Sequence, residues 1–252
     1  MSLKLLDTIN YGYGHLEPVI IGLMAIHRNF ILIGRHGSGK SRIARILSQG
    51  YGKQGFVMYD ATKDDLLTIA GIPDPRAMQE GRLGFTPHQR TIWDKSTVVV
   101  DEITRAAKEN QNLWLEILEE KTCFGLPLSY RTLIATANPE SYAAAFRLDD
   151  ALLDRFNAVL PIPDGQIGMD ATTIEQVVNL SLGEPNPLEA ETLARIFAEI
   201  QTAYKVMYNG AEGKKVITYV SRMMAEILAA QNKKNDEEKN LHQRPNIRTP
   251  AA

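Results

Sequence analysis

The chain lacks several features that would place it in a specialised class of protein. It has one cysteine among its 252 residues, so it cannot close an internal disulfide. We therefore expect Cys123 to be a packed thiol and the compartment to be reducing. Neither sign of charge dominates: 28 basic residues stand against 30 acidic ones, a net charge of −2. Such a balance predicts no general attraction to nucleic acid or to an anionic membrane.

Long apolar runs are also missing. The most apolar early segment, residues 19–26, is too short to span a bilayer. Asp7 follows closely behind Leu5 and Leu6, which is unlike a secretion signal, so we expect a cytoplasmic protein with no membrane span. A composition of 44% hydrophobic and 23% charged residues is that of an ordinary globular protein, with one large or two unequal domains.

What the sequence does contain is a glycine-rich loop with the spacing G-x-x-x-x-G-K-S. The apolar run 29–33 precedes it, and apolar residues at helical spacing follow it. Backbone N–H groups of such a loop close around phosphate oxygens, an exposed lysine adds positive charge, and the serine can ligate Mg²⁺. The loop predicts a nucleoside triphosphate site made by Gly34, Gly37, Ser38, Gly39, Lys40 and Ser41.

Two further polar groups follow strongly apolar segments. Asp101 and Glu102 end the run Thr97–Val100, whose β-branched residues do not alternate with polar ones. Such a run predicts a strand buried on both faces of a parallel sheet. In a doubly wound sheet its carboxyl end lies beside the phosphate loop. There Asp101 can hold Mg²⁺, and Glu102 can accept a proton from the water that attacks the γ-phosphate.

Other apolar runs complete an alternation of strands and helices. We expect strands at residues 56–59, 132–137 and 158–162, and a helix containing Leu66 to Ile69 that Thr62 caps. Glycines and prolines interrupt that helix, so residues 71–85 are predicted to be a loop or hairpin that projects from the core.

The remaining polar residues of interest lie near the ends of the last two strands. Asn138 follows the strand 132–137, where its amide can orient the attacking water, although asparagine before proline is also an ordinary turn residue. Arg155 ends a short helix before the strand 158–162. From there it cannot easily turn back into its own nucleotide pocket, but it could reach a neighbour's.

Taken together, these motifs resemble an AAA+ ATPase and, within that superfamily, the MoxR family. The resemblance runs from about Gly14 to Ile162. The insert at residues 71–85 and the segments Asp101–Ala106 and Leu115–Lys121 point to the MoxR branch. The resemblance implies an α/β fold, with a parallel five-stranded sheet flanked by helices and a small C-terminal helical lid. It also implies ATP and Mg²⁺ as ligands.

Carried over position by position, the resemblance implies a role for each site residue. The roles are Walker A for Lys40 and Ser41, Walker B for Asp101 and Glu102, sensor 1 for Asn138, and an arginine finger acting on an adjacent subunit for Arg155. Arg147 is a second candidate finger whose spacing fits less well.

Three residues are assigned more loosely. Gly14 and His15 match the place where the family's N-terminal segment lines the adenine pocket. Arg222 resembles the sensor 2 arginine of the lid, but the proline expected nearby is missing, and it fits an ordinary solvated helix residue as well.

The resemblance divides the chain into three parts. We expect a nucleotide-binding core at residues 1–163, a lid at 164–231 with helices at 172–182, 188–208 and 217–231, and a polar mobile tail at 232–252. The chain ends earlier than typical relatives, which implies a reduced lid.

Two classes of function compete at this point. The MoxR resemblance implies a hexameric ring that remodels or activates a client protein, often with a partner carrying a von Willebrand A-type domain. The alternative is a nucleic-acid-associated motor or a restriction-type NTPase. Within the insert, Arg76 and Arg82 are balanced by Asp74 and Glu80, which disfavours a DNA-tracking loop. An assembly factor that hardly hydrolyses and a simple P-loop kinase fit less well.

Overall fold

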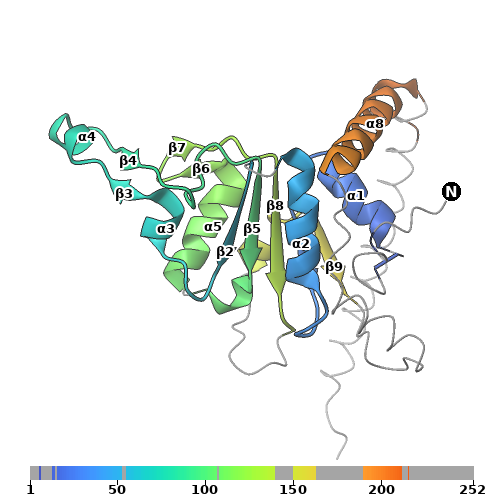
Figure 1. Cartoon of the computed structure of the whole chain (residues 1–252), viewed down its shortest axis with the longest axis horizontal. Helices are drawn as coiled ribbons and strands as arrows, with labels where there is room; N and C mark the ends of the chain where they lie inside the picture. The colour runs from blue at the N-terminus through green and yellow to red at the C-terminus, as the bar shows by residue number, and fades with distance from the viewer. Residues whose placement is uncertain are drawn as a thin grey trace, which may run out of the picture. The chain divides into compact units, whose positions relative to one another are not determined.

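The computed structural model describes residues 6, 13–14, 16–52, 55–106, 108–139, 150–162, 190–211 and 215. At the centre of the chain is a five-stranded sheet whose neighbouring strands run parallel (Figure 1). Its strands in sheet order are β2 (Phe56–Asp60), β5 (Thr97–Asp101), β8 (Thr132–Ala137), β1 (Phe30–Ile33) and β9 (Ala158–Pro161). The fold class predicted from the sequence is confirmed.

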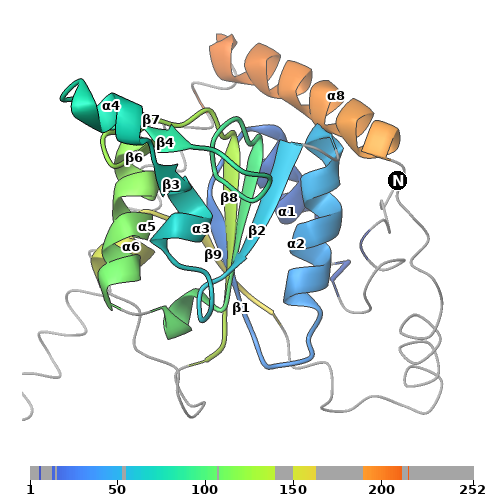
Figure 2. The ribbon, with the colours of Figure 1, turned by 60° about the vertical axis from the view of Figure 1, so that its left-hand side comes forward.

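Helices cover both faces of this sheet (Figure 2). One layer consists of α3 (Leu66–Ala70), α5 (Lys108–Glu120) and α6 (Asp150–Leu153). The other consists of α1 (Glu17–Ala25), α2 (Lys40–Ser48) and the first turns of α8 (Ala190–Asn209). Val98 and Val100 pack against the first layer, and Val99 packs against the second. The run of β-branched residues in β5 therefore reflects burial on both faces, as predicted.

The part of the chain from β3 to β4, residues 72–86, projects from the sheet as an arm (Figure 1). Its strands β3 (Ile72–Pro73) and β4 (Phe85–Thr86) pair antiparallel, so of the two forms predicted there, a loop or a hairpin, the structure has the hairpin. The short helix α4 (Pro75–Gln79) inside it was not predicted. Pro75 begins that helix, and the Asp74 side chain accepts a hydrogen bond from the Arg76 N–H, a cap that a short helix needs.

A second small hairpin lies beside the arm. Its strands are β6 (Thr122–Cys123) and β7 (Leu126–Pro127). At its turn, the ring of Phe124 lies 5.4 Å from the ring of Phe85, measured between centroids. Two insertions that are distant in sequence therefore share an aromatic contact.

The cap of helix α3 differs from the sequence-based expectation. Asp65 accepts a hydrogen bond of 2.9 Å from the Thr68 N–H and is the N-cap residue. Thr62 instead donates its hydroxyl to the carboxylate of Asp60 at the end of β2. Both residue types make good caps, so the correct one is decided by where the chain leaves the strand.

The chain divides into two compact units, Met1–Gln201 and Thr202–Ala252. The helix predicted at residues 188–208 corresponds to α8, whereas those predicted at 172–182 and 217–231 lie outside the described residues. Two short 3₁₀ helices, η1 (Gln49–Tyr51) and η3 (Ile103–Arg105), follow α2 and β5, respectively. None of the described helices combines the length and apolar character that crossing a membrane would require.

Cys123 is buried in the core against the first helix layer, as expected for a packed thiol. Burial raises the pKa of the Cys123 thiol to about 12. At pH 8 the thiolate is then only about 10⁻⁴ of the population. We expect iodoacetamide to leave the native protein unmodified for an hour and to alkylate it fully in guanidinium. Mass spectrometry measures the alkylation, and rapid modification of the native protein would contradict the burial of Cys123.

Candidate nucleotide-binding site

The register of the sheet brings the predicted site residues to one edge. Ile33 at the end of β1 is level with Ala137 at the end of β8, and Val100 of β5 is level with Ala135. The Gly34 N–H donates to the Ala137 carbonyl across this edge. Because parallel strands end at the same edge, the segments that follow β1, β5 and β8 converge there.

The phosphate loop connects β1 to α2. Gly37 and Gly39 have φ values of 80° and 82°, in the left-handed region that favours glycine. Gly34 packs so closely that a Cβ atom there would lie 2.8 Å from Cβ of Ile162. The Tyr13 hydroxyl donates to the Ser38 carbonyl at 3.0 Å and fixes the loop from outside. Sequence reasoning did not identify this contact.

Lys40 begins helix α2 and points back into the loop. Its Nζ donates to the carbonyl oxygens of Gly34 and Arg35 at 2.7 and 2.8 Å, and it lies 3.3 Å from the Asn138 Oδ1. The side chain is only 7% exposed, so the expectation of an exposed lysine was wrong. Burial lowers the pKa of Lys40 from its ordinary value, and Asp101 and Glu102 oppose that shift. A buried ammonium group of this kind favours a strongly anionic ligand.

Ser41 and Asp101 meet although 60 residues separate them. The Ser41 hydroxyl donates to the Asp101 Oδ1 at 2.7 Å. Thr136 also donates its hydroxyl to that oxygen, and the same hydroxyl accepts the Glu102 N–H at 3.1 Å. Thr136 was missed from the sequence; the signal was a hydroxyl residue near the end of an apolar strand. Hydroxyl and carboxylate oxygens are the donors that Mg²⁺ prefers.

Glu102 and Asn138 face one another beside this cluster. The Nδ2 of Asn138 lies 3.5 Å from the Oε1 of Glu102, at the outer limit of a hydrogen bond. Asn138 is 4% exposed, and its amide reaches Lys40 on one side and Glu102 on the other. An acceptor and an amide are thus held together at the mouth of the phosphate loop, an arrangement suited to orienting a water molecule.

These side chains surround a single cavity of about 290 Å³. It is lined by His36, Gly37, Gly39, Lys40, Ser41, Arg42, Asp101, Glu102, Thr136 and Asn138. The N-terminus of α2 opens into it, so the helix dipole adds positive potential where phosphate would bind. Sequence reasoning did not single out His36 and Arg42, two further basic side chains in this lining.

Arg155 lies at the opposite edge of the sheet. The Asn157 N–H donates to the Asn29 carbonyl, and the next residue, Ala158, is level with Phe30 at the start of β1. The four residues of β1 therefore separate Arg155 from its own phosphate loop, about 13 Å along the strand. Its guanidinium forms an ion pair of 2.8 Å with Glu119 of α5, and both side chains are exposed by more than a third.

The looser predictions have different outcomes. Gly14 lies within the described residues, next to the Tyr13 that contacts the phosphate loop. Its role in an adenine pocket stays a prediction. His15, Arg147 and Arg222 lie outside the described residues.

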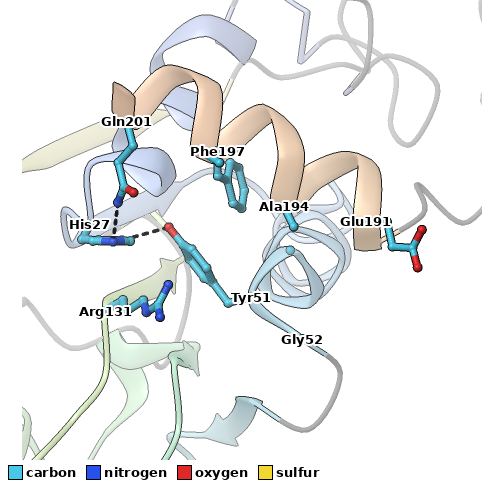
Figure 3. A pocket seen from close by; sticks show the side chains of 10 residues that line it. His27, Tyr51, Gly52, Arg131, Glu191, Ala194, Phe197 and Gln201 are labelled. Carbon is cyan, nitrogen blue, oxygen red and sulfur yellow. Dashed lines mark hydrogen bonds between the residues drawn. The ribbon is translucent and has the colours of Figure 1, made fainter. Parts of the chain in front are cut away.

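A second cavity, of about 410 Å³, is lined by residues of η1 and α8 and of the loops that precede β1 and β8 (Figure 3). His27 joins two elements there: its Nδ1 bonds the Tyr51 hydroxyl at 3.0 Å, and its Nε2 bonds the Gln201 side chain at 2.6 Å. The ring of Phe197 packs 5.1 Å from that of Tyr51. These contacts hold the part of α8 up to Gln201 against η1 and the loop that precedes β1.

A parallel sheet of this order, with a glycine-rich loop between β1 and α2 and carboxylates at the end of a neighbouring strand, defines a P-loop nucleotide-binding protein. Residues 29–156 match the family model described as AAA domain (dynein-related subfamily), which is about half of the chain. The chain belongs to this family of AAA domains. The resemblance to AAA+ ATPases is confirmed at this level.

One solved structure extends the comparison to the fold. The chain resembles the crystal structure of a candidate ATPase from Cytophaga hutchinsonii ATCC 33406, with a TM-score of 0.53 and 18% identity. The alignment covers 77% of this chain and 60% of that one. At such low identity the likeness concerns the fold alone. No curated protein sequence matches the chain significantly.

Proposed function

We propose that this chain is a MoxR-like AAA+ ATPase that hydrolyses Mg·ATP at interfaces between identical subunits and uses the cycle to remodel or activate a client protein. The observation that carries the proposal is the convergence of Lys40, Ser41, Asp101, Glu102 and Asn138 on one cavity. The position of Arg155 supports hydrolysis between subunits, since it lies at the edge of the sheet remote from its own phosphate loop.

The residues around the cavity fit a bound magnesium ion. Ser41 Oγ and Asp101 Oδ1 lie 2.7 Å apart at the end of the loop, and both are hard oxygen donors. They would hold Mg²⁺, which supplies positive charge to the β and γ phosphates when bound. The Lys40 ammonium and the N-terminus of α2 bind the same phosphates.

In this proposal, hydrolysis depends on Glu102 and Asn138. The carboxylate of Glu102 accepts a proton from the attacking water, and the amide of Asn138 orients that water. Arg155 from an adjacent subunit stabilises the charge that develops on the transferred phosphoryl group. ATP binding and ATP hydrolysis therefore rest on different side chains, which allows them to be separated by mutation.

Glu102→Gln is expected to bind Mg·ATP with parent affinity and to turn it over about 100-fold more slowly or worse, because an amide cannot accept the proton. Calorimetry measures the affinity, and phosphate release measures the rate. Glu80→Gln is the matched control, since Glu80 is an exposed carboxylate of the insert. Equal losses of affinity and rate would make Glu102 a metal ligand instead, and turnover at the parent rate would exclude both roles.

The choice of a protein client over nucleic acid rests on the arm. Arg82 pairs with Glu80 there, which leaves no excess of basic charge on that turn. Ile72, Met78 and Leu83 are more than half exposed on the same arm, which suits contact with a protein. Affinity purification of the Glu102→Gln variant with ATP tests the choice: a co-purifying protein, with or without a von Willebrand A-type domain, supports it, and nucleic acid alone contradicts it.

A further inference from the structure

Arg105 lies next to the Glu102 carboxylate and has no role in the function proposed above. Its Nη1 forms an ion pair of 2.9 Å with the Oε2 of Glu102. Arg105 ends the 3₁₀ helix η3, and its own N–H donates to the Glu102 carbonyl at 2.8 Å. One short turn therefore carries both the guanidinium and the carboxylate, and it is closed by a backbone hydrogen bond and by the side-chain ion pair between the same two residues.

The backbone of Glu102 is held in an unusual conformation at this turn. Its φ is 54°, in the left-handed region that a residue with a side chain rarely adopts. The Glu102 N–H is bound to the Thr136 hydroxyl of β8, so the turn is anchored to the neighbouring strand. A conformation of this kind persists only where the surroundings fix it, and such positions concentrate at functional sites.

The two oxygens of the Glu102 carboxylate have different neighbours. Oε2 is bound to Arg105, and Oε1 lies 3.5 Å from the Asn138 amide. Glu102 lines the nucleotide cavity, whereas Arg105 is not among the described residues that line it. The guanidinium therefore acts from behind the carboxylate and leaves one oxygen directed to the side where Asn138 lies.

We propose that Arg105 is a positioning residue for hydrolysis, which holds Oε2 of Glu102 so that Oε1 stays aimed at the attacking water beside Asn138. This inference rests on the proposed role of Glu102 as the proton acceptor. Without the guanidinium, the carboxylate gains rotamers that point away from the water. A catalytic group displaced by about 1 Å can lose up to roughly 100-fold in rate.

An ordinary structural role makes a different prediction. The side chains of Arg105 and Glu102 are 35% and 24% exposed, and a partly exposed pair at this spacing contributes little to folding stability. If the pair only stiffened the turn, replacing Arg105 would lower the melting temperature. Any effect on kcat would then be the same whether residue 102 is glutamate or glutamine. The kinetic effect of the proposed role exists only while Glu102 carries a carboxylate.

The test compares Arg105→Gln and Arg105→Lys, each with and without Glu102→Gln, in the full chain at saturating protein concentration. We expect Arg105→Gln to lower kcat about ten-fold with the affinity for Mg·ATP within two-fold of the parent, and Arg105→Lys to recover part of that loss. In the Glu102→Gln background, replacing Arg105 is expected to cause no further loss. Arg82→Ala is the control, since Arg82 also pairs with a glutamate but lies on the arm.

Three results would overturn the proposal: an Arg105→Gln variant with parent kcat, an equal further loss in the Glu102→Gln background, or a loss confined to ATP affinity. If Arg105→Gln fails to fold, the comparison of Arg105→Lys in the two backgrounds still decides, because lysine keeps the charge but not the forked geometry. Failure of the function proposed above is distinguishable, because Glu102→Gln alone would then turn over ATP at the parent rate.

Discussion

Arg155→Ala subunits are expected to hydrolyse ATP roughly 10³-fold more slowly than the parent chain, and activity is expected to return when they are mixed with Glu102→Gln subunits. Arg155 precedes β9, whose first residue, Ala158, is level with Phe30 at the start of β1, while the phosphate loop follows the end of β1. The guanidinium therefore cannot serve its own loop. If the subunits form the proposed rings, some interfaces of a mixed ring combine an intact Glu102 with an intact Arg155, and only those interfaces are expected to hydrolyse ATP.

The mixing experiment has a matched control within the same chain. Subunits that carry both Arg155→Ala and Glu102→Gln co-assemble but supply no arginine, so mixing them with Arg155→Ala subunits is expected to restore nothing. Specific activity of the parent chain is also expected to rise with protein concentration. If the two single variants demonstrably co-assemble and activity stays absent, Arg155 does not act between subunits and the ring mechanism is wrong.

The ion pair of Arg155 with Glu119 bears on the same experiment. Both side chains are exposed by more than a third, so the pair contributes only about 1 kcal/mol or less. An incoming phosphate at a subunit interface can replace Glu119 at that small cost. The pair is therefore compatible with a finger that changes partner on assembly.

Lys40→Ala is expected to abolish measurable ATP binding, with a loss of affinity of about 100-fold or more. Lys40 is buried in the phosphate loop, where its charge is poorly solvated and close to the site of the β and γ phosphates. Calorimetry with Mg·ATP measures the loss, and Lys95→Ala is the control because that lysine lies away from the cavity. Unchanged affinity would exclude the loop as a nucleotide site.

The same substitution is expected to leave the fold largely intact, with a local change that the sequence did not suggest. The Nζ of Lys40 donates to the carbonyls of Gly34 and Arg35, so alanine removes two hydrogen bonds that close the loop. The sheet and its two helix layers do not depend on these bonds. Circular dichroism should match the parent, and a cooperative loss of helix signal at 25 °C would show that the substitution had unfolded the chain.

The strands and most of the site could be predicted because their signals are local. The β-branched residues of the run 97–100 predict a strand, and the structure has β5 there. The insert at residues 71–85 was predicted from its glycines and prolines, but α4 was not, because five residues give too weak a helical period. The cap of α3 was assigned to Thr62 instead of Asp65 for a different reason: both residue types are good caps, and only the path of the chain decides between them.

Some contacts of the site could not be found from the sequence at all. Tyr13 reaches Ser38 over 25 residues, and Thr136 reaches Asp101 over 35. Neither residue stands in a recognisable spacing with its partner. Arg105 is three residues from Glu102, and the two side chains meet because a 3₁₀ turn, η3, follows Glu102.

By itself, the sequence determined that this protein has a phosphate-binding loop, because the loop is one contiguous segment, Gly34 to Ser41, whose glycines and lysine act through local backbone geometry. The tertiary structure decided which distant groups complete it. The strand order β5-β8-β1 puts Asp101 beside Ser41 and Asn138 beside Lys40. The parallel register of β9 on β1 leaves Arg155 near the starts of these strands, away from the phosphate loop. Strand order depends on how the buried faces of the whole sheet pack against two helix layers, and no single segment contains that information.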